Sequence, residues 1–530
     1  MQSLNSNGRD GQPLLNSFPY LSGGIYSSAI PTVISLTVCF LFLLEPASAQ
    51  TTNESASAGS SVEIRTLLFF DDQRLNQRDN VERHLGKPEL LPDSIYRDPH
   101  TVTVWGYPTV YYDAPSGKWR MLYLGWTDVN LGHRYPLLAE SDDGLHWKPR
   151  DTTREIQLAD RRFPHQVLPL SEFSEWPPCY VDERAAPAER IKGLVVFHSG
   201  KHVISTRLWV SPNGIEWKLK EGVEWQKPGP DPGVAVFWNA VRGSYAFTTR
   251  PDWTDRRIAL FETRDWVRFT EPELALQTDA LDAPLTQLYG MPVFPYAGYY
   301  VGFLWLYHTV PQVKGQAPHK FLGGHVDCQL TYSLNGWHFQ RGLRTPFIGN
   351  GAPGEPTAGC VYPSSLIQKA DGSLWIYASA GTHEHAIIPP GSGAILTYKL
   401  RRDGFVYLES ANGTGTVGTV ALLWKGGDVE VNAQSPNGRV RVRVTAPNGE
   451  LLQGYDFADC EPLTGDEIAW KPTWKNGKTL DMLGTRTLRL EVELTSARLY
   501  ALRGRFTPLV AGEVWRFNED GTWPRERPGF

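Results

Sequence analysis

A carboxylate side chain at Asp282 stands just before the clearest strand that the sequence predicts. The segment Leu281–Tyr289 leads into that strand, and Pro284 stiffens the approach because its ring fixes the backbone φ angle. We therefore expect Asp282 to be held in place rather than to move freely in solvent. A fixed carboxylate beside Tyr289, within reach of a guanidinium such as that of Arg250, meets the requirement for a general acid or base.

A second carboxylate must face the first if the two are to divide acid and base roles. Asp98 is the partner that we expect, because the sequence Arg97-Asp98-Pro99 precedes the first of the strand units described below. Glu355 precedes the last unit and is the reserve candidate. An acid before a strand can equally be a turn cap or the ion-pair partner of an arginine, so each assignment is a hypothesis.

Five further side chains complete the predicted site as substrate-binding residues. Trp238 and Tyr289 could stack on a ligand ring or pack between strands, and Arg250 could clamp a carboxylate or pair with one of the acids. His308 could be a general acid or a buried, hydrogen-bonding histidine. Glu384 lies between two histidines, but no third ligand follows at fixed spacing, so we predict no metal site.

A seven-residue motif recurs along the chain and marks the turns that would position these side chains. Its template is Ser or Thr, any residue, Asp or Asn, Gly, two further residues and an aromatic residue. Asx-Gly makes a tight turn, because Gly adopts positive φ and the Asx side chain bonds its own backbone. Three close copies occupy residues 141–147, 211–217 and 333–339, and looser copies occupy 263–269 and 401–407. This spacing is typical of propeller repeats.

The strand pattern around these copies predicts an all-β chain of two domains. Five units of four strands predict a five-bladed β-propeller over residues 63–411. The run Tyr300–Tyr307 is apolar without alternation, as expected of a strand that is packed on both faces. Beyond the propeller, valine and leucine alternate with charged residues and Asn-Gly marks hairpins. This pattern predicts a C-terminal β-sandwich and tail over residues 412–530.

The N-terminal segment has the pattern of an export signal. An apolar run at residues 29–44 precedes Ala47-Ser48-Ala49, which predicts a signal peptide over residues 1–49 and cleavage after Ala49. A linker rich in Ser, Thr and Ala follows at 50–62. We therefore expect a secreted or periplasmic protein, with an uncleaved membrane anchor as the alternative.

Composition and charge argue against several classes of protein. The net charge of -5 and the lack of a basic cluster argue against a nucleic-acid partner. Glycine-rich phosphate-binding motifs are absent, so no cofactor is expected. Beyond the export signal we expect no membrane association, and the sequence does not predict an oligomeric state. The four cysteines after the predicted signal peptide have no Cys-x-x-Cys spacing, so we expect free, buried thiols.

The repeats and the two-domain organisation resemble the propeller-plus-sandwich glycoside hydrolases of families 32 and 43. The resemblance covers residues 63–508. Within these families, the chain is similar to an exported bacterial branch that is family-32-like. It rests on the blade motif Asp143–Trp147 and on the blocks Thr286–Tyr296 and Asp459–Asp466. The Trp-x-Asn-Asp-Pro-Asn signature and the Glu-Cys acid motif of family 32 are absent. The resemblance implies a carbohydrate substrate.

Glycoside hydrolysis needs two carboxyl groups that flank the scissile bond. One protonates the leaving oxygen, and the other attacks the anomeric carbon or activates water. From their places before the blades, we assign these roles to Asp282 and Asp98 as a hypothesis, facing each other across the propeller funnel. The third blade has Asn239 and the fifth has Thr357 where a carboxylate would be expected. A non-catalytic carbohydrate-binding or scaffold propeller is therefore the alternative function.

Overall fold

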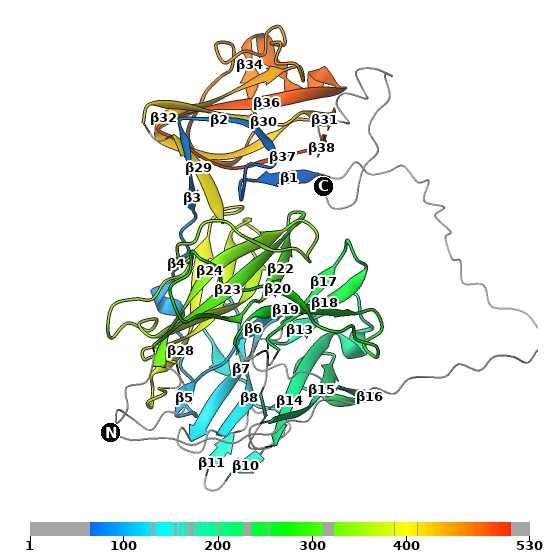
Figure 1. Cartoon of the computed structure of the whole chain (residues 1–530), viewed down its shortest axis with the longest axis vertical. Helices are drawn as coiled ribbons and strands as arrows, with labels where there is room; N and C mark the ends of the chain where they lie inside the picture. Colours follow the sequence, from blue (N-terminus) through cyan, green and yellow to red (C-terminus); the bar gives the residue numbers. More distant parts are fainter. Residues whose placement is uncertain are drawn as a thin grey trace, which may run out of the picture. The chain divides into compact units, whose positions relative to one another are not determined.

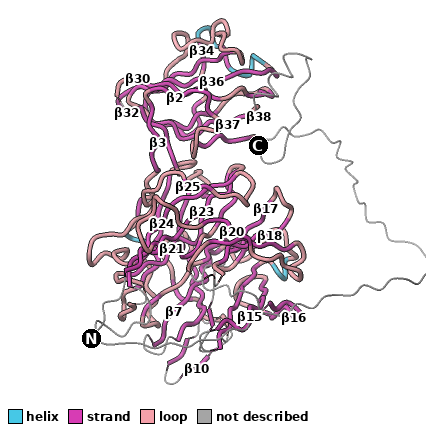
Figure 2. Tube along the Cα trace, in the orientation of Figure 1, coloured by secondary structure: helices cyan, strands magenta, loops and turns pink. Residues whose placement is uncertain are grey.

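The computed structural model describes residues 64–128, 133–152, 156–158, 161–163, 165, 167–168, 174–175, 178–199, 202–225, 235–251, 253, 255–310, 323–385, 387–410 and 412–509. The predicted signal peptide and linker lie outside these residues. Strands dominate (Figure 2), and the helical elements described are four short 3-10 turns: η1 (Pro92–Ser94), η2 (Pro187–Glu189), η3 (Lys475–Gly477) and η4 (Leu480–Leu483). In the described part of the chain, no helix is long and apolar enough to cross a membrane.

Five twisted antiparallel blades form the predicted propeller (Figure 1). A parallel pair, Val326 opposite Cys360, joins blades 4 and 5 into one sheet. Blade 1 holds β5 (Thr103–Val104), β6 (Thr109–Asp113), β7 (Lys118–Asp128), β8 (His133–Ser141) and β9 (Lys148–Pro149). Blade 2 holds β12 (Ser174–Glu175), β13 (Tyr180–Val181), β14 (Ile191–Ser199), β15 (His202–Ser211) and β16 (Lys218–Trp225). Blade 3 holds β17 (Ala235–Asn239), β18 (Ser244–Thr249), β19 (Ile258–Thr263) and β20 (Glu273–Leu276). Blade 4 holds β21 (Thr286–Gly290), β22 (Val293–Tyr296), β23 (Tyr299–Val310), β24 (Gly323–Ser333) and β25 (Gln340–Arg341). Blade 5 holds β26 (Cys360–Gln368), β27 (Leu374–Gly381), β28 (Gly393–Leu400) and β4 (Glu89–Leu90). Outside the five blades, β10 (Ile156–Leu158) pairs with β11 (Arg161–Phe163) in a two-stranded ribbon.

The repeat motif forms the same turn in four of its five copies. The Ser or Thr hydroxyl accepts the N–H of the fourth residue, and the Asx oxygen accepts the N–H groups of the fifth and sixth residues. Gly144 has φ +82°, as predicted. A Cβ atom there would lie 3.2 Å from the Tyr377 hydroxyl, so any side chain would be both strained and crowded. Trp266 takes the glycine position at φ +60° in the looser copy of blade 3.

The fifth copy of the motif is not a blade turn, which corrects the sequence interpretation. The outer strand of blade 5 was expected after residue 405. Instead, β29 (Val406–Ser410) pairs with sandwich strands, and β4 supplies the outer strand, with Glu89 opposite Lys399. A strand from before the first blade therefore closes the last one. Local sequence patterns cannot show such a pairing, because its partners are distant along the chain.

The sandwich is assembled from both ends of the chain. Its strands form an eleven-stranded assembly that combines three N-terminal strands with eight from the C-terminal region. They are β1 (Arg65–Leu68), β2 (Leu75–Asp79), β3 (Val81–Leu85), β29, β30 (Thr414–Thr419), β31 (Leu422–Lys425), β32 (Glu430–Thr445), β33 (Leu463–Trp470), β36 (Thr485–Thr495), β37 (Arg498–Gly504) and β38 (Phe506–Pro508). A small ribbon, β34 (Thr473–Trp474) and β35 (Lys478–Thr479), accompanies them. The prediction placed all of residues 63–411 in the propeller. In the structure, the strands within residues 65–85 instead pair with strands of the sandwich.

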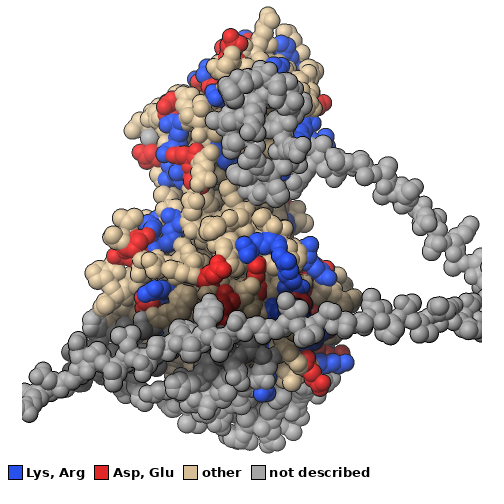
Figure 3. Space-filling view, turned by 45° about the vertical axis from the view of Figure 1, so that its right-hand side comes forward, with Lys and Arg blue, Asp and Glu red and all other residues tan. Residues whose placement is uncertain are grey.

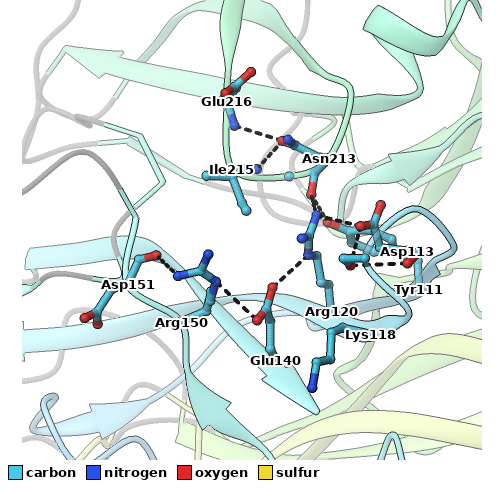
Figure 4. A network of polar contacts seen from close by, with 12 residues as sticks. Tyr111, Asp113, Lys118, Arg120, Glu140, Arg150, Asp151, Asn213, Ile215 and Glu216 are labelled. Carbon is cyan, nitrogen blue, oxygen red and sulfur yellow. Dashed lines mark hydrogen bonds and ion pairs between the residues drawn. The ribbon is translucent and has the colours of Figure 1, made fainter. Parts of the chain in front are cut away.

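Polar contacts as well as apolar ones join neighbouring blades. Arg120 on β7 is 5% exposed and lies between Asp113 and Glu140, at 3.1 and 3.0 Å (Figure 4). Its guanidinium also donates to the backbone oxygen of Asn213 in the repeat turn of blade 2, and the Tyr111 hydroxyl donates to the same oxygen. Two carboxylates therefore balance a buried cation at the junction of blades 1 and 2. The four described cysteines are buried free thiols, which confirms the prediction.

Each blade has two ends, and the predicted site residues are not shared equally between them. In blade 4 the start of β21 lies opposite the end of β23, with Thr286 beside His308. The end of β23 lies opposite the start of β24, with Val310 beside Gly323. We call this the loop end of the blade. The repeat turns follow the third strand at the opposite end, which we call the turn end.

Candidate functional site

An aromatic cluster lies where the inner strands of blades 1, 4 and 5 approach each other. Tyr107 stacks on Trp305 with ring centres 4.8 Å apart, and Tyr289 lies 5.9 Å from Tyr307. The cluster is buried and comprises Trp105, Tyr107, Trp126, Tyr289, Trp305, Tyr307 and Tyr362, with Val326 and Cys360. Tyr289, a predicted ring-stacking residue, is thus packed between blades.

Cationic side chains cover the outer side of this cluster. The Arg250 guanidinium lies 4.4 Å from the centre of the Tyr289 ring and donates to the Tyr289 backbone oxygen at 3.1 Å. Arg256 lies 5.6 Å from the same ring and donates to the neutral amide oxygen of Gln287. The His385 ring lies 4.9 Å from the Tyr289 ring. Arg250 and Tyr289 are therefore close, and a cation–π contact and a hydrogen bond join them.

Asp282 is fixed, but its partner is Arg341 and not Arg250. The Arg341 guanidinium donates to both carboxylate oxygens, at 2.7 and 2.6 Å, and Arg344 lies 3.6 Å away. Burial raises the pKa of Asp282, but the Arg341 hydrogen bonds and charge outweigh it, so the pKa lies below its ordinary value. Asp282 is therefore ionised at neutral pH and poorly suited to donate a proton.

Asp98 is enclosed within the protein. Its side chain is fully buried; one oxygen accepts the Tyr123 hydroxyl at 2.7 Å and contacts His165 Nε2 at 2.8 Å. The other oxygen accepts the His100 N–H at 2.7 Å. Burial raises the pKa of Asp98, but the hydrogen bonds and the His165 charge lower it by more. Asp98 and Asp282 thus bind different partners, and their facing each other across the funnel stays a prediction.

Two other predicted residues have local contacts. Glu355 is exposed and accepts the Ala352 N–H at 3.1 Å, so it caps its own loop. Trp238 packs against Tyr245 at 5.0 Å, next to the hairpin that joins β17 to β18, and the Arg184 guanidinium lies 4.2 Å from its ring. Trp238 therefore lies at the turn end, whereas Arg250, Tyr289, His308 and Glu384 lie at the loop end.

A group of titratable side chains gathers at the loop end of blade 4. We call His308, His325, Asp327 and Glu384 the histidine cluster. His308 Nε2 lies 2.9 Å from Asp327 Oδ2, and the two imidazole rings stack 4.8 Å apart. Glu384 is exposed and accepts the Gly324 N–H at 2.9 Å, so the loop between β27 and β28 brings it to the start of β24. Buried Asp327 Oδ1 has no hydrogen-bond partner among the described residues.

The two imidazoles have pKa values shifted in opposite directions. The hydrogen bond to Asp327 raises the pKa of His308, although burial opposes it, and the nearby charges of Asp327 and Asp282 add to the increase. Burial and the charge of His308 lower the pKa of His325, while Asp327 and Glu384 raise it less. His308 therefore favours its protonated form and His325 its neutral form. Titratable neighbours whose pKa values diverge are typical of acid and base assignments.

The histidine cluster was only partly predicted. His308 and Glu384 were candidates from the sequence, whereas His325 was not. A signal for it existed: His325 and Asp327 are two residues apart directly before the predicted strand Cys328–Tyr332, and they share one face because β24 begins earlier, at Gly323. The stacking of His325 on His308 depends on the pairing of β23 with β24, where the two residues lie directly opposite each other.

On the visible face of Figure 3, charged side chains are mixed in sign. On the face drawn in Figure 3, acidic side chains lie close to most of the basic ones. Mixed charges produce weak long-range fields, so recognition on this face depends on local contacts.

Solved structures with a similar fold come from carbohydrate-related proteins. An N-acetylgalactosamine deacetylase from F. plautii, in complex with blood group B trisaccharide, has 15% identity and a TM-score of 0.41, covering 60% of this chain and 95% of that one. A thermostable family-43 glycoside hydrolase has 11% identity and a TM-score of 0.38, covering 59% and 95%. A β-fructofuranosidase from Schwanniomyces occidentalis has 9% identity and a TM-score of 0.39, covering 80% and 98%.

Neither a protein-family model nor a curated protein matches this chain. The structural likenesses have low identity and low TM-scores, so what the chain can do chemically follows from its own side chains.

Proposed function

We propose that the protein is a glycoside hydrolase whose site is the histidine cluster at the loop end of blade 4. The observation that carries the proposal is the stacking of His308, whose pKa is raised by the Asp327 hydrogen bond, on His325, whose pKa is lowered by burial, next to exposed Glu384. Glycosidic cleavage requires a general acid and a second group that attacks the anomeric carbon or activates water; here the His308 imidazolium takes the acid role that a carboxyl group usually has, and Glu384 takes the second role.

Each member of the cluster has a role in this mechanism. His308 protonates the leaving glycosidic oxygen, and Asp327 stabilises the imidazolium before the transfer. Glu384 attacks the anomeric carbon or activates a water molecule, because its carboxylate is exposed and receives only one N–H at Oε2 in the contacts described. Neutral His325 lies close enough to Asp327 and Glu384 for both to affect its pKa, and it adds no further positive charge beside the substrate.

A non-catalytic carbohydrate-binding propeller is the second candidate. A specific observation favours it: Asp282 is bound by Arg341, and Asp98 by Tyr123 and His165, so both predicted carboxylates have structural partners.

A polysaccharide panel tests the proposal against this alternative. We expect purified protein comprising residues 50–530 to release reducing ends from at least one neutral plant or algal polysaccharide. Release should stop with His308→Gln, while binding to that polysaccharide remains. Binding by the unmodified protein without any product would contradict hydrolysis and support the non-catalytic candidate.

Export of the protein is part of the same proposal, because extracellular polysaccharides are reached only outside the cell. The supporting pattern is the apolar run followed by Ala47-Ser48-Ala49. Intact-mass measurement of secreted protein should give a chain that begins at Gln50. A secreted chain that retains Met1 would show that the segment is not cleaved.

A further inference from the structure

The sandwich carries a groove built by strands that contribute nothing to the histidine cluster. Its volume is about 800 Å³, within the range of small-molecule sites, and its walls come mainly from β3, β29, β32 and β37. Glu82 lies opposite Glu409, Glu409 opposite Arg498, and Arg498 opposite Gln434. Opposite residues on antiparallel strands project from the same face, so these four side chains form one polar row.

Aromatic rings lie beside this polar row. His84 is opposite Tyr407, and their rings are stacked with centres 5.4 Å apart. Tyr407 also lies 5.4 Å from Tyr500, and the Arg498 guanidinium is 5.0 Å from the Tyr407 ring. Of these rings, His84 lines the groove itself, and Tyr407 supports it from beside the groove.

A donor and an acceptor are neighbours in the row. Arg498 Nε donates to Glu409 Oε1 at 2.8 Å, while Glu409 Oε2 lies 3.8 Å from His84 Nε2, beyond hydrogen-bond length. The side chains of Glu409, Arg498 and His84 are 32%, 42% and 39% exposed. Their polar ends therefore remain accessible to a ligand while their stems are held in place.

Solvation alone explains charged residues on an outward sheet face, and an exposed ion pair adds at most about 1 kcal/mol to stability. Solvation does not explain why an acceptor and a donor adjoin the His84 ring within a concave site. A carboxylate beside a guanidinium matches neighbouring hydroxyl groups, one donating and one accepting. A ring face matches the C–H face of a pyranose.

We propose that this sandwich groove is a second carbohydrate site that binds a neutral oligosaccharide. Neighbouring hydroxyls contact Glu409 and Arg498, and the apolar face of one sugar ring lies against the His84 ring. The groove holds a polysaccharide chain and takes no part in bond cleavage. This inference is independent of the proposed hydrolysis.

Calorimetry with neutral hexasaccharides of xylan, arabinan, galactan and fructan type tests the groove. The titrations use protein comprising residues 50–530 that carries His308→Gln, so that the ligands stay intact. We expect saturable binding of at least one hexasaccharide, weakened at least about 10-fold by Glu409→Gln and by Arg498→Gln, because each change removes a charge-assisted hydrogen bond. The matched control is Arg441→Gln, which breaks another arginine–glutamate pair of the sandwich, with Glu493, outside the groove.

Three results would overturn the groove proposal. They are no saturable binding to any of the four hexasaccharides, equal affinities in the groove variants and the control, and loss of binding in Arg441→Gln as well. Failure of hydrolysis in the polysaccharide panel leaves these titrations unaffected, so the two proposals fail separately. In an otherwise unmodified chain, the groove variants should hydrolyse a short soluble substrate at the normal rate.

Discussion

Replacing His308 by glutamine should lower the rate of polysaccharide hydrolysis at least about 100-fold, the usual contribution of a positioned general acid. Glutamine retains a hydrogen-bonding group near Asp327 but cannot donate a proton to a leaving oxygen. Initial rates of reducing-end release, measured for both proteins at saturating substrate, give the comparison. Because His308 is 27% exposed, we expect little change in the thermal midpoint.

A second histidine–aspartate pair provides the matched control. His146 Nδ1 lies 2.6 Å from Asp143 in the first repeat turn, at the turn end of its blade. His146→Gln should therefore leave the rate unchanged. If His308→Gln retains more than about a tenth of the activity, or if His146→Gln is equally impaired, His308 is not the acid.

The pH profile separates proton donation from a structural role. A proton donor must be protonated, so the rate should fall as the pH rises through the raised pKa of His308. The Asp327 hydrogen bond is the main cause of that increase. Asp327→Asn should therefore move the basic limb of the profile to lower pH, whereas damage to the fold would lower the rate at every pH.

Replacing Asp403 by alanine should lower the free energy of unfolding by about 3–5 kcal/mol, because it leaves a charge without its partner in a buried site. Asp403 is 1% exposed, and Arg503 Nη2 lies 3.0 Å from both of its oxygens. The Tyr296 hydroxyl donates to it at 2.8 Å. Alanine would also have to adopt φ +58°, which aspartate tolerates better. Urea unfolding followed by tryptophan fluorescence and by circular dichroism measures the loss.

An exposed ion pair of the same type is the control. Asp466 is 47% exposed and pairs with Arg401 at 2.6 Å. Asp466→Ala should cost less than about 1 kcal/mol, because water screens the charges. If the two substitutions lowered the free energy of unfolding equally, burial of the Asp403 ion pair would add nothing to stability. That result would contradict the prediction.

Local chemistry in the sequence determined the repeat turns and the strand pattern. The hydrogen bonds of Ser141, Asp143 and Gly144 all close within six residues, so the residue types alone specify the turn. The unbroken apolar run Tyr300–Tyr307 likewise specifies a strand buried on both faces, and it forms most of β23. These features need no distant partner, which is why a five-bladed propeller with a sandwich could be predicted.

Only the tertiary structure decided which distant segments meet. β4 closes the fifth blade and β1–β3 join the sandwich, although both precede the first blade in the sequence. The sequence placed a fixed carboxylate at Asp282, yet Arg341, 59 residues away, is its partner. Similarly, His308 meets His325 only because β23 and β24 pair in one register. A residue's type shows which contacts it can make, but its pKa and role depend on which neighbours the folded chain brings to it.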